Sequence, residues 1–292
     1  MKVGFVTIIG RPNVGKSTLL NAILGQKVSI VSNKPNTTRI MVNGVLTTDD
    51  YQIVFYDTPG IHKAKEHINK LMVIQSENAI GLADVIYLMV TPDDFLGYET
   101  KKIIDIISAH SQPKFLLINK IDAFKKEKVV TTANKLYGCY PFDYVLPISA
   151  IKAKNLDLLI NITVPFLKER QIVYNEDVIT TLDNKIIVAE FVREQIYRII
   201  SEEVPYNVLV ECEELHENAD DSIYALVTLY VNRESQKGIM IGNKGETIKR
   251  IRINAKKNLE DLFGCKIYLD LWVKIRNNWM VDKKCLRIQG LL

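Results

Sequence analysis

The sequence of 292 residues predicts an α/β domain with a doubly wound, mostly parallel sheet, followed by a smaller α+β domain. Three observations support this fold class. Short apolar runs alternate with amphipathic stretches from residue 3 to about residue 168. A glycine-containing loop joins the first apolar run to the next helical stretch. After residue 183 the predicted order changes to helix, strand, strand, helix, helix, strand.

The first domain is predicted over residues 1–168. Its expected strands are 5–9, 53–56, 85–90, 115–118 and 145–148, and they are almost entirely apolar. That composition is typical of parallel strands covered by helices on both faces. Amphipathic stretches at 68–82 and 100–110 are predicted as two of the covering helices.

A more polar stretch without periodicity, residues 169–183, is predicted as a linker. The second domain, residues 184–292, opens with a helix whose apolar face includes Ile186, Val192 and Ile199. Strands are expected at 207–213 and 222–231, helices at 236–241 and 246–263, and a last alternating strand at 267–275. The tail after Trp279 is short.

Charge is divided unevenly between these domains. Residues 230–292 hold 14 Lys and Arg against six Asp and Glu, whereas the rest of the chain has a net charge of −4. A basic C-terminal region points to a polyanionic partner there. No apolar stretch reaches the roughly 20 residues of a membrane span, so a cytoplasmic protein is expected. The four cysteines are far apart and form no CxxC pair, which indicates neither a zinc site nor a disulfide framework.

The loop after the first strand fits the phosphate-binding pattern GxxxxGK[ST]. Its backbone N–H groups and the following helix N-terminus form a nest for phosphate oxygens. Lys16 is expected on the β- and γ-phosphates, and Ser17 on Mg²⁺. The nucleotide-binding residues predicted here are Gly10, Arg11, Pro12, Asn13, Val14, Gly15, Lys16, Ser17 and Thr18.

Two later motifs predict the nucleotide's identity as GTP or GDP. Asp57 ends an apolar run and would hold Mg²⁺ through water, while the Gly60 N–H would sense the γ-phosphate. A carboxylate at Asp122 can accept hydrogen bonds from guanine N1–H and its amine, which adenine does not offer. The Ala150 N–H would meet guanine O6. The remaining predicted contacts are Thr58, Pro59, Ile61, Asn119, Lys120, Ile121 and Ser149.

Hydrolysis is expected to depend on a mobile threonine and to lack a glutamine. Thr38, in the segment 36–39, is predicted to close over Mg²⁺ when GTP is bound, as the switch segments of GTPases do. Ile61 stands where signalling GTPases place the glutamine that orients water. Intrinsic hydrolysis should therefore be slow, or assisted from elsewhere. The predicted catalytic residues are Lys16, Thr38, Gly60 and Asn13, and the predicted metal ligands are Ser17, Thr38 and Asp57.

A GxxG loop between two predicted helices of the basic domain indicates RNA binding. Such a loop lets single-stranded phosphates approach the backbone while an apolar groove receives the bases. The predicted RNA-binding residues are Ile241, Gly242, Asn243, Lys244, Gly245, Lys249 and Arg250. Trp272 and Trp279 could stack on bases, but core or interface packing is the preferred interpretation of both.

With these motifs in place, the chain resembles the Era family of bacterial GTPases, of the TrmE-Era-EngA type with a C-terminal type II KH domain. The resemblance covers nearly the whole length and includes segments 36–39, 57–63, 203–206, 241–245 and 269–274. It implies a P-loop GTPase that binds the 3′ end of small-subunit (16S) ribosomal RNA and the 30S subunit. It further implies assistance in subunit assembly, peripheral inner-membrane association and a monomeric state.

The family pattern also implies that Asn13 helps to hold a K⁺ ion beside the phosphates. The chain departs from the usual family sequence at Arg252, where glycine is common, and at Ala153. Three other interpretations remain open. One is an RNA-binding scaffold whose nucleotide site is inactive, another is a P-loop ATPase, and the third is a tRNA-modification GTPase, which would lack the GxxG domain.

Overall fold

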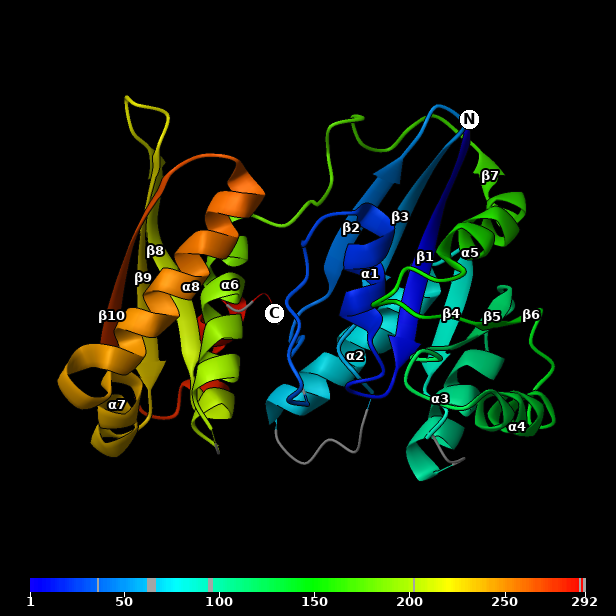
Figure 1. The fold of residues 1–292 in the computed structure, drawn as a ribbon, viewed down its shortest axis with the longest axis horizontal. Helices are drawn as coiled ribbons and strands as arrows, with labels where there is room; N and C mark the ends of the chain where they lie inside the picture. The colour runs from blue at the N-terminus through cyan, green and yellow to red at the C-terminus, as the bar shows by residue number, and fades with distance from the viewer. Residues whose placement is uncertain (36, 62–66, 94–96, 202, 289, 291–292) are drawn as a thin grey trace. The chain divides into compact units, whose positions relative to one another are not determined.

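The computed structural model describes residues 1–292 except 36, 62–66, 94–96, 202, 289 and 291–292 (Figure 1). The chain divides into two compact units. Unit 1 consists of residues 1–29 and 38–181, and unit 2 of residues 30–37 and 182–292. A short piece from the first domain predicted by the sequence therefore belongs to unit 2, together with the C-terminal part of the chain.

Unit 1 contains a sheet of seven strands with the order β2-β3-β1-β4-β5-β6, and β7 pairs with β1. The strands are β1 (Lys2–Gly10), β2 (Val42–Thr47), β3 (Tyr51–Asp57), β4 (Val85–Val90), β5 (Lys114–Ile118), β6 (Tyr144–Pro147) and β7 (Lys168–Glu169). All neighbouring pairs from β3 to β6 are parallel. The predicted doubly wound sheet is thus confirmed.

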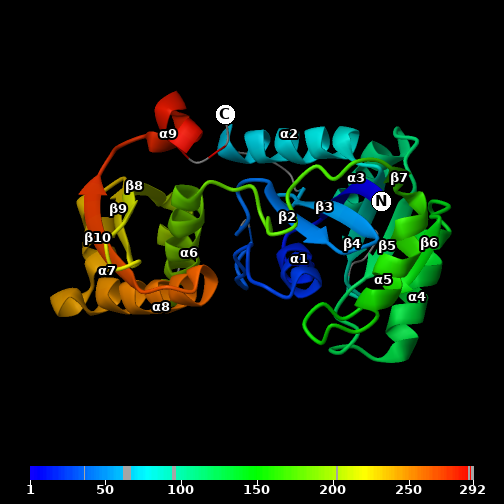
Figure 2. The same cartoon turned by 90° about the horizontal axis from the view of Figure 1, so that it is seen from above.

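Helices cover both faces of this sheet, and α1 and α2 lie on opposite faces in Figure 2. The helices are α1 (Lys16–Leu24), α2 (His67–Leu82), α3 (Tyr98–Ser108), α4 (Lys126–Tyr137) and α5 (Leu156–Thr163). Every residue of β4 and β5 is buried, including Tyr87 and Phe115, whose rings stack at 5.7 Å. Coverage on both sides explains why these strands carry apolar side chains at successive positions.

Two features of the sheet edge were not predicted from the sequence. The strand β2 pairs antiparallel with β3, in register from Val42 with Asp57 to Thr47 with Gln52. The predicted linker then runs beside β2, where the Val45 N–H donates to the Ile179 carbonyl at 2.8 Å. The buried Gln52 side chain accepts from the N–H groups of Val173 and Tyr174 at 2.8 and 3.1 Å. Residues 173–179 are therefore fixed along unit 1.

Unit 2 has the predicted α-β-β-α-α-β order. Its elements are α6 (Asn184–Ile199), β8 (Leu209–Glu217), β9 (Ile223–Val231), α7 (Glu234–Ile241), α8 (Glu246–Phe263) and β10 (Ile267–Ile275), followed by the short helix α9 (Lys283–Ile288). The strand order is β10-β9-β8, with β9 parallel to β10 and antiparallel to β8. Helices α6 and α8 lie side by side and contact one face of this sheet (Figure 1).

The core of unit 2 lies between the sheet and these helices. Val227 and Leu229 from β9 pack there with Val188 and Val192 from α6 and Ile251 from α8. Alternation along β9 and β10 sends every second side chain into this core and the others to the opposite face. Trp279 is fully buried and donates its indole N–H to the Asn207 carbonyl at 3.1 Å. Core packing is thereby confirmed for Trp279, whereas Trp272 is 59% exposed.

Candidate nucleotide and nucleic-acid sites

The phosphate loop leaves β1 at Gly10 and enters α1 at Lys16, as the motif predicts. Positive φ angles occur at Asn13 (64°) and Gly15 (103°). A Cβ on Gly15 would lie 2.4 Å from Asn119 Nδ2, and one on Gly10 would lie 2.4 Å from the Met89 carbonyl oxygen. Both glycines are therefore required by close packing of the loop against the neighbouring strand ends.

Lys16 is buried and directs its ammonium group back along this loop. Its Nζ donates to the carbonyls of Gly10 and Arg11 at 3.2 and 3.0 Å. Burial lowers the pKa of Lys16 to about 8, and the negative charge of Asp57 partly opposes this shift. A buried ammonium group whose hydrogen-bond acceptors are two neutral carbonyls would be strongly stabilised by an anionic ligand. The loop is thus suited to the phosphates of a nucleotide.

Hydroxyl and carboxylate oxygens gather beside the first turn of α1. The Ser17 Oγ donates to Asp57 Oδ2 at 2.6 Å and lies 2.9 Å from Thr38 Oγ1. Ser29 Oγ also donates to Asp57 Oδ2, at 2.8 Å, while Asp57 Oδ1 is buried and has no hydrogen-bond partner among the described residues. Burial raises the pKa of Asp57, against the opposing charge of Lys16. These oxygen donors fit Mg²⁺, which prefers hard ligands.

The structure distinguishes the two threonines of the predicted switch. Thr38 Oγ1 lies at the oxygen cluster, whereas Thr37 Oγ1 donates to the Lys34 carbonyl at 2.8 Å and contacts Ser32 Oγ at 2.6 Å. Both side chains are buried. Asn36 lies outside the described residues. Of the two, Thr38 occupies the position expected of the residue that senses Mg²⁺.

Asn119 connects the phosphate loop to the loop predicted to bind the base. Its Nδ2 donates to the Val14 carbonyl at 2.8 Å, and its Oδ1 accepts from the Ala150 N–H at 2.9 Å. A guanine O6 that accepts from the Ala150 N–H would therefore share this N–H with Asn119 Oδ1. Lys120 has a φ of 65° and reaches over the phosphate loop to the Asn13 carbonyl at 2.7 Å. Sequence reasoning did not identify this bracing.

Asp122 is the exposed carboxylate of the base-binding loop. Ser149 Oγ, which is buried, donates to Asp122 Oδ1 at 2.5 Å. This contact uses one carboxylate oxygen and orients the other. The fixed carboxylate next to Ala150 has the chemistry required to accept two donors from a guanine edge. Ile121 is half-buried and packs against the core of unit 1.

The segment after Asp57 approaches the phosphate loop through its backbone. A Cβ on Gly60 would lie 2.6 Å from the Pro12 nitrogen, and the Ile61 N–H donates to the Gly10 carbonyl at 3.2 Å. The Ile61 side chain is 1% exposed and packs in the core of unit 1. It points away from solvent and offers no group to a water molecule. Thr58 Oγ1 donates to the Ile8 carbonyl at 2.8 Å, and the Pro59 carbonyl accepts from Ser76 Oγ at 2.8 Å.

Three other predicted residues of the phosphate loop have different environments. Arg11 pairs with Glu99 of α3 at 2.9 Å, Asn13 is exposed at the tip of the loop, and Thr18 is half-buried in α1. Among the described residues no group of three His, Cys, Asp or Glu side chains could hold a metal ion. A metal at this site would depend on the hydroxyls of Ser17 and Thr38 together with Asp57.

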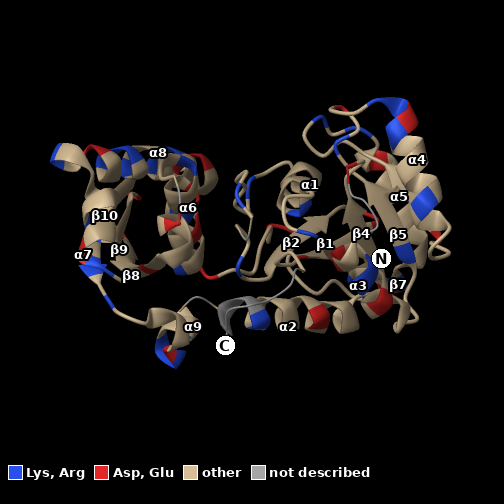
Figure 3. Cartoon of the chain, turned by 90° about the horizontal axis from the view of Figure 1, so that it is seen from below, with Lys and Arg blue, Asp and Glu red and all other residues tan. Residues whose placement is uncertain are grey.

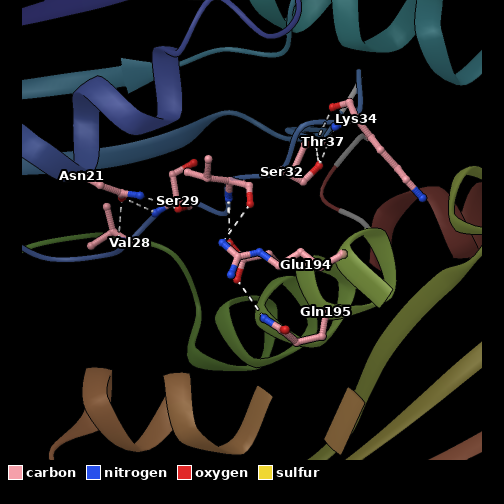
Figure 4. Close-up of polar contacts among 10 residues, drawn as sticks. Asn21, Val28, Ser29, Ser32, Lys34, Thr37, Glu194 and Gln195 are labelled. Atoms are coloured by element: carbon pink, nitrogen blue, oxygen red, sulfur yellow. Dashed lines mark hydrogen bonds and ion pairs between the residues drawn. The ribbon is translucent and has the colours of Figure 1, made fainter. Parts of the chain in front are cut away.

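The segment 30–37 follows α1 in sequence, and its described residues include two that contact α6 or the residue after it inside unit 2 (Figure 4). Glu194 Oε1 accepts from the Val31 N–H at 2.9 Å, and Arg198 donates to the Val31 carbonyl at 3.2 Å. Lys34 Nζ donates to the Ile200 carbonyl. These contacts fix the segment on α6, and nothing in the local sequence pattern predicted them.

The GxxG loop joins α7 to α8, as predicted. Gly242 has a φ of 76°, and a Cβ there would lie 2.1 Å from Thr247 Oγ1. Lys244 and Gly245 also have positive φ angles, 48° and 79°. Several basic residues lie along α8 (Figure 3). Those predicted to bind RNA are Asn243, Lys244, Lys249 and Arg250, all exposed, with Ile241 half-buried.

At Gly245 no atom would lie within 4 Å of a Cβ, so the backbone is open there. An open backbone beside cationic side chains suits a polyanion that approaches closely. Arg252 adds a further exposed positive charge on α8. In the described part of the chain, no helix combines the length and the apolar composition that crossing a membrane requires.

Comparisons with known proteins agree with this geometry. A family model described as 50S ribosome-binding GTPase matches residues 5–120, and a KH domain model matches residues 203–280. The chain is 40% identical to GTPase Era of Clostridium kluyveri over 290 residues, which is 99% of both proteins. It is 42% identical to GTPase Era of Thermoanaerobacter sp. strain X514, covering 99% of this chain and 96% of the relative.

Two solved structures resemble the whole chain. One is Era in complex with MgGDPNP and nucleotides 1506–1542 of 16S ribosomal RNA, with a TM-score of 0.95, 36% identity and coverage of 100% of this chain and 99% of that one. The other is a variant of Aquifex aeolicus Era bound to GDP and AlF₄⁻, with the same TM-score, identity and coverage.

Proposed function

Since the chain belongs to the Era family of GTPases, we propose that it couples GTP hydrolysis to binding of the 3′ end of 16S ribosomal RNA during small-subunit assembly. The observation that supports this proposal is that one chain brings together the residues predicted for both sites. One is the phosphate loop with its oxygen cluster, and the other is the strained GxxG loop beside the basic surface of α8. A scaffold with an inactive nucleotide site would not need to retain Lys16, Thr38 and Asp57 in this arrangement.

Each residue of the nucleotide site has a distinct part in the proposed reaction. Lys16 would neutralise the β- and γ-phosphates, and the Gly60 backbone would contact the γ-phosphate. Ser17 and Thr38 would bind Mg²⁺ directly, and Asp57 through water. When bound, Mg²⁺ stabilises negative charge that develops on the phosphates. Because Thr38 belongs to the segment between α1 and β2, its position would report whether the γ-phosphate is present.

The Ile61 side chain cannot orient water, because it has no hydrogen-bonding group and is buried in the core of unit 1. We assign charge compensation to a K⁺ ion held with the help of Asn13, which is exposed at the tip of the phosphate loop. Turnover by the wild-type protein should be faster in KCl than in NaCl at equal ionic strength, which controls for screening. Asn13→Gly should abolish the difference, because glycine accepts the φ of 64° but carries no ligand oxygen.

Asn13→Asp is the matched control for this prediction. It retains an oxygen ligand and tolerates the left-handed backbone. Activation by K⁺ should therefore persist in Asn13→Asp. Equal turnover of the wild-type protein in both salts would contradict the proposed role of K⁺.

Binding of RNA is tested at the GxxG loop. Asn243→Asp with Lys244→Asp retains both glycines but places negative charge against phosphate, so affinity for an oligonucleotide of the 16S rRNA 3′ end should fall more than about tenfold. Asn134→Asp with Lys135→Asp on α4 makes the same charge change at exposed positions of unit 1. This control and the loop variant should both retain GTP turnover. Equal RNA affinity for the loop variant and the wild type would place the RNA groove elsewhere.

The remaining parts of the proposal concern partners and location. We expect a monomer in the cytoplasm that binds the 30S subunit and associates peripherally with the inner membrane, as the family resemblance implies. Co-sedimentation with purified 30S subunits and with inner-membrane vesicles, in GDP and in a GTP analogue, measures both associations. Absence from the 30S pellet in both nucleotide states would contradict subunit binding.

A further inference from the structure

The three-stranded sheet of unit 2 has a second face, opposite to α6 and α8, that we call the open sheet face. Strand register arranges its side chains in rows across β8, β9 and β10. From one end these rows are His216–Tyr224–Tyr268, Glu214–Leu226–Asp270, Glu211–Thr228–Trp272 and Leu209–Tyr230–Lys274. Leu209 and Thr228 are fully buried, so the accessible part of the face lies mainly along β10. A bulge between Cys212 and Glu214 adds Glu213, whose carboxylate accepts from Tyr230 Oη and Lys274 Nζ.

Aromatic rings on this face are unusually accessible. Trp272 is 59% exposed and Tyr268 is 42% exposed, although both lie in a regular strand. A large aromatic side chain gains most when it is buried, and tryptophan and tyrosine are enriched where proteins bind one another. The contrast with the fully buried Trp279 shows that Trp272 has no part in the core.

Carboxylates surround these rings. Asp270 lies between Tyr268 and Trp272 on the same side of β10, at alternate positions of the strand. The rows and the bulge carry four carboxylates, those of Glu211, Glu213, Glu214 and Asp270. Three cations lie over the rings of this face: Lys266, Lys274 and Arg276. Lys274 pairs with Glu213 at 3.1 Å and Arg276 with Asp282 at 2.7 Å, so the other three carboxylates of the face outnumber the remaining cation, Lys266.

The rings of this face already attract cations of the chain itself. Lys266 Nζ lies 4.7 Å from the centroid of Tyr268, and Lys274 Nζ lies 6.0 Å from that of Trp272. Arg276 lies 5.8 Å from the centroid of Tyr230. These distances are within the range of cation–π attraction. A ring next to the carboxylate of Asp270, which accepts a long hydrogen bond of 3.3 Å from Tyr224 Oη, therefore offers two sources of attraction to a positively charged group.

The charge on the open sheet face is opposite to that of the GxxG surface. Lys244, Lys249 and Arg250 serve the polyanion proposed at the loop and α8, whereas a polyanion at the open sheet face would meet Glu214 and Asp270. Complementarity thus favours a cationic occupant at the open sheet face and disfavours a second segment of RNA.

We propose that the open sheet face binds an arginine-rich segment of a partner protein. Guanidinium groups of that segment would stack on Trp272 and Tyr268 and pair with Asp270 and Glu214. Arginine suits this surface better than lysine, because its planar group stacks on a ring and forms bidentate bonds with a carboxylate. This inference is independent of the RNA function proposed for the GxxG loop, since it concerns the other face of the sheet.

The test uses the full chain and a fluorescein-labelled peptide of six Arg-Gly repeats as the probe, with affinity measured by fluorescence anisotropy. Trp272→Ala and Asp270→Asn should each weaken peptide binding about fivefold, the effect of one exposed cation–π contact or charge pair. Tyr98→Ala and Asp261→Asn are matched controls at other exposed positions and should bind as wild type. Because Trp272 and Asp270 are exposed, both variants should fold.

Three outcomes would overturn the inference. Peptide affinity could be equal in the wild type, Trp272→Ala and Asp270→Asn. The two variants could instead lose affinity for the 16S rRNA oligonucleotide while peptide binding stays constant, which would assign the face to RNA. Sedimentation could show a wild-type dimer that Trp272→Ala converts to a monomer, which would assign the face to a second copy of the chain.

Discussion

Asp122 is the residue on which base choice should depend most directly. Asp122→Asn retains the Oδ1 that accepts from Ser149 but replaces the second carboxylate oxygen with a donor. GTP affinity should fall by at least about a hundredfold, because two guanine donors lose their acceptor. Xanthosine triphosphate, which has a carbonyl in place of the guanine amine, should then be preferred. Competition binding with both nucleotides measures the exchange, and unchanged GTP affinity would contradict the assignment of Asp122.

Single residues of the nucleotide site could be predicted wherever a motif has one chemical purpose. The sequence predicted that Ser17 and Asp57 lie together, because a metal requires oxygen groups after particular strand ends, and the structure places Ser17 Oγ 2.6 Å from Asp57 Oδ2. The interaction of Asn119 with Val14 and Ala150 could not be predicted. Asn119 is 105 residues from Val14 and 31 residues from Ala150 in sequence. A local sequence pattern contains no information about contacts between such distant residues.

Strands and helices could be predicted best where buried apolar residues recur at a regular spacing in the sequence. For α8 and β10 the observed bounds equal those predicted, because one face of each is apolar at a constant period. The edge strand β2 was missed. Its sequence, Val-Asn-Gly-Val-Leu-Thr, includes a polar residue and a glycine that weaken a strand pattern. Antiparallel pairing with β3 supplies the stability that its own composition lacks.

The segment predicted as a linker illustrates the same limit. The polar composition of residues 169–183 suggested a connection without fixed contacts. Instead, Gln52 Oε1 accepts from the N–H groups of Val173 and Tyr174, and Gln52 Nε2 donates to the Tyr174 carbonyl at 2.7 Å. The buried side chain of Gln52 thus determines the path of residues 173 and 174, which lie more than 120 positions later in the sequence. Sequence reasoning cannot anticipate such a pairing.

Gln52→Ala should release this stretch from the sheet edge. Three backbone groups of Val173 and Tyr174 would lose their partner, and each unsatisfied group costs about 1–3 kcal/mol unless water replaces it. Hydrogen exchange at the amides of residues 173 and 174 should become at least about tenfold faster. Gln112→Ala is a suitable control, because the hydrogen bond found for the Gln112 side chain among the described residues is a long one, of 3.5 Å to the Ile80 carbonyl. Unchanged exchange in Gln52→Ala would show that other contacts fix this stretch.

At the scale of the whole molecule, the segment 30–37 connects the chemistry of the nucleotide to unit 2. Its two ends are adjacent to Ser29 and Thr38, both of which contact the Ser17–Asp57 cluster. Between these ends, Val31 is bound to α6 and Lys34 to Ile200, the residue that follows α6. A change in the position of Thr38 is therefore passed along the backbone to a segment whose own contacts are with unit 2. Coupling of this kind is reciprocal, so RNA bound to unit 2 should in turn affect nucleotide binding.

Lys34→Ala with Arg198→Ala removes two of the side chains that hold this segment on α6. We expect the wild-type protein to bind the 16S rRNA oligonucleotide with different affinities in GDP and in GDPNP, and the double variant to lose most of that difference. Lys126→Ala with Lys135→Ala on α4 removes the same charge from unit 1 and should retain the difference. Basal GTP turnover should persist in both variants, since neither Lys34 nor Arg198 is among the residues assigned to the nucleotide. If the double variant kept the full nucleotide dependence of the wild type, the contacts of segment 30–37 with α6 would have no part in coupling the two sites.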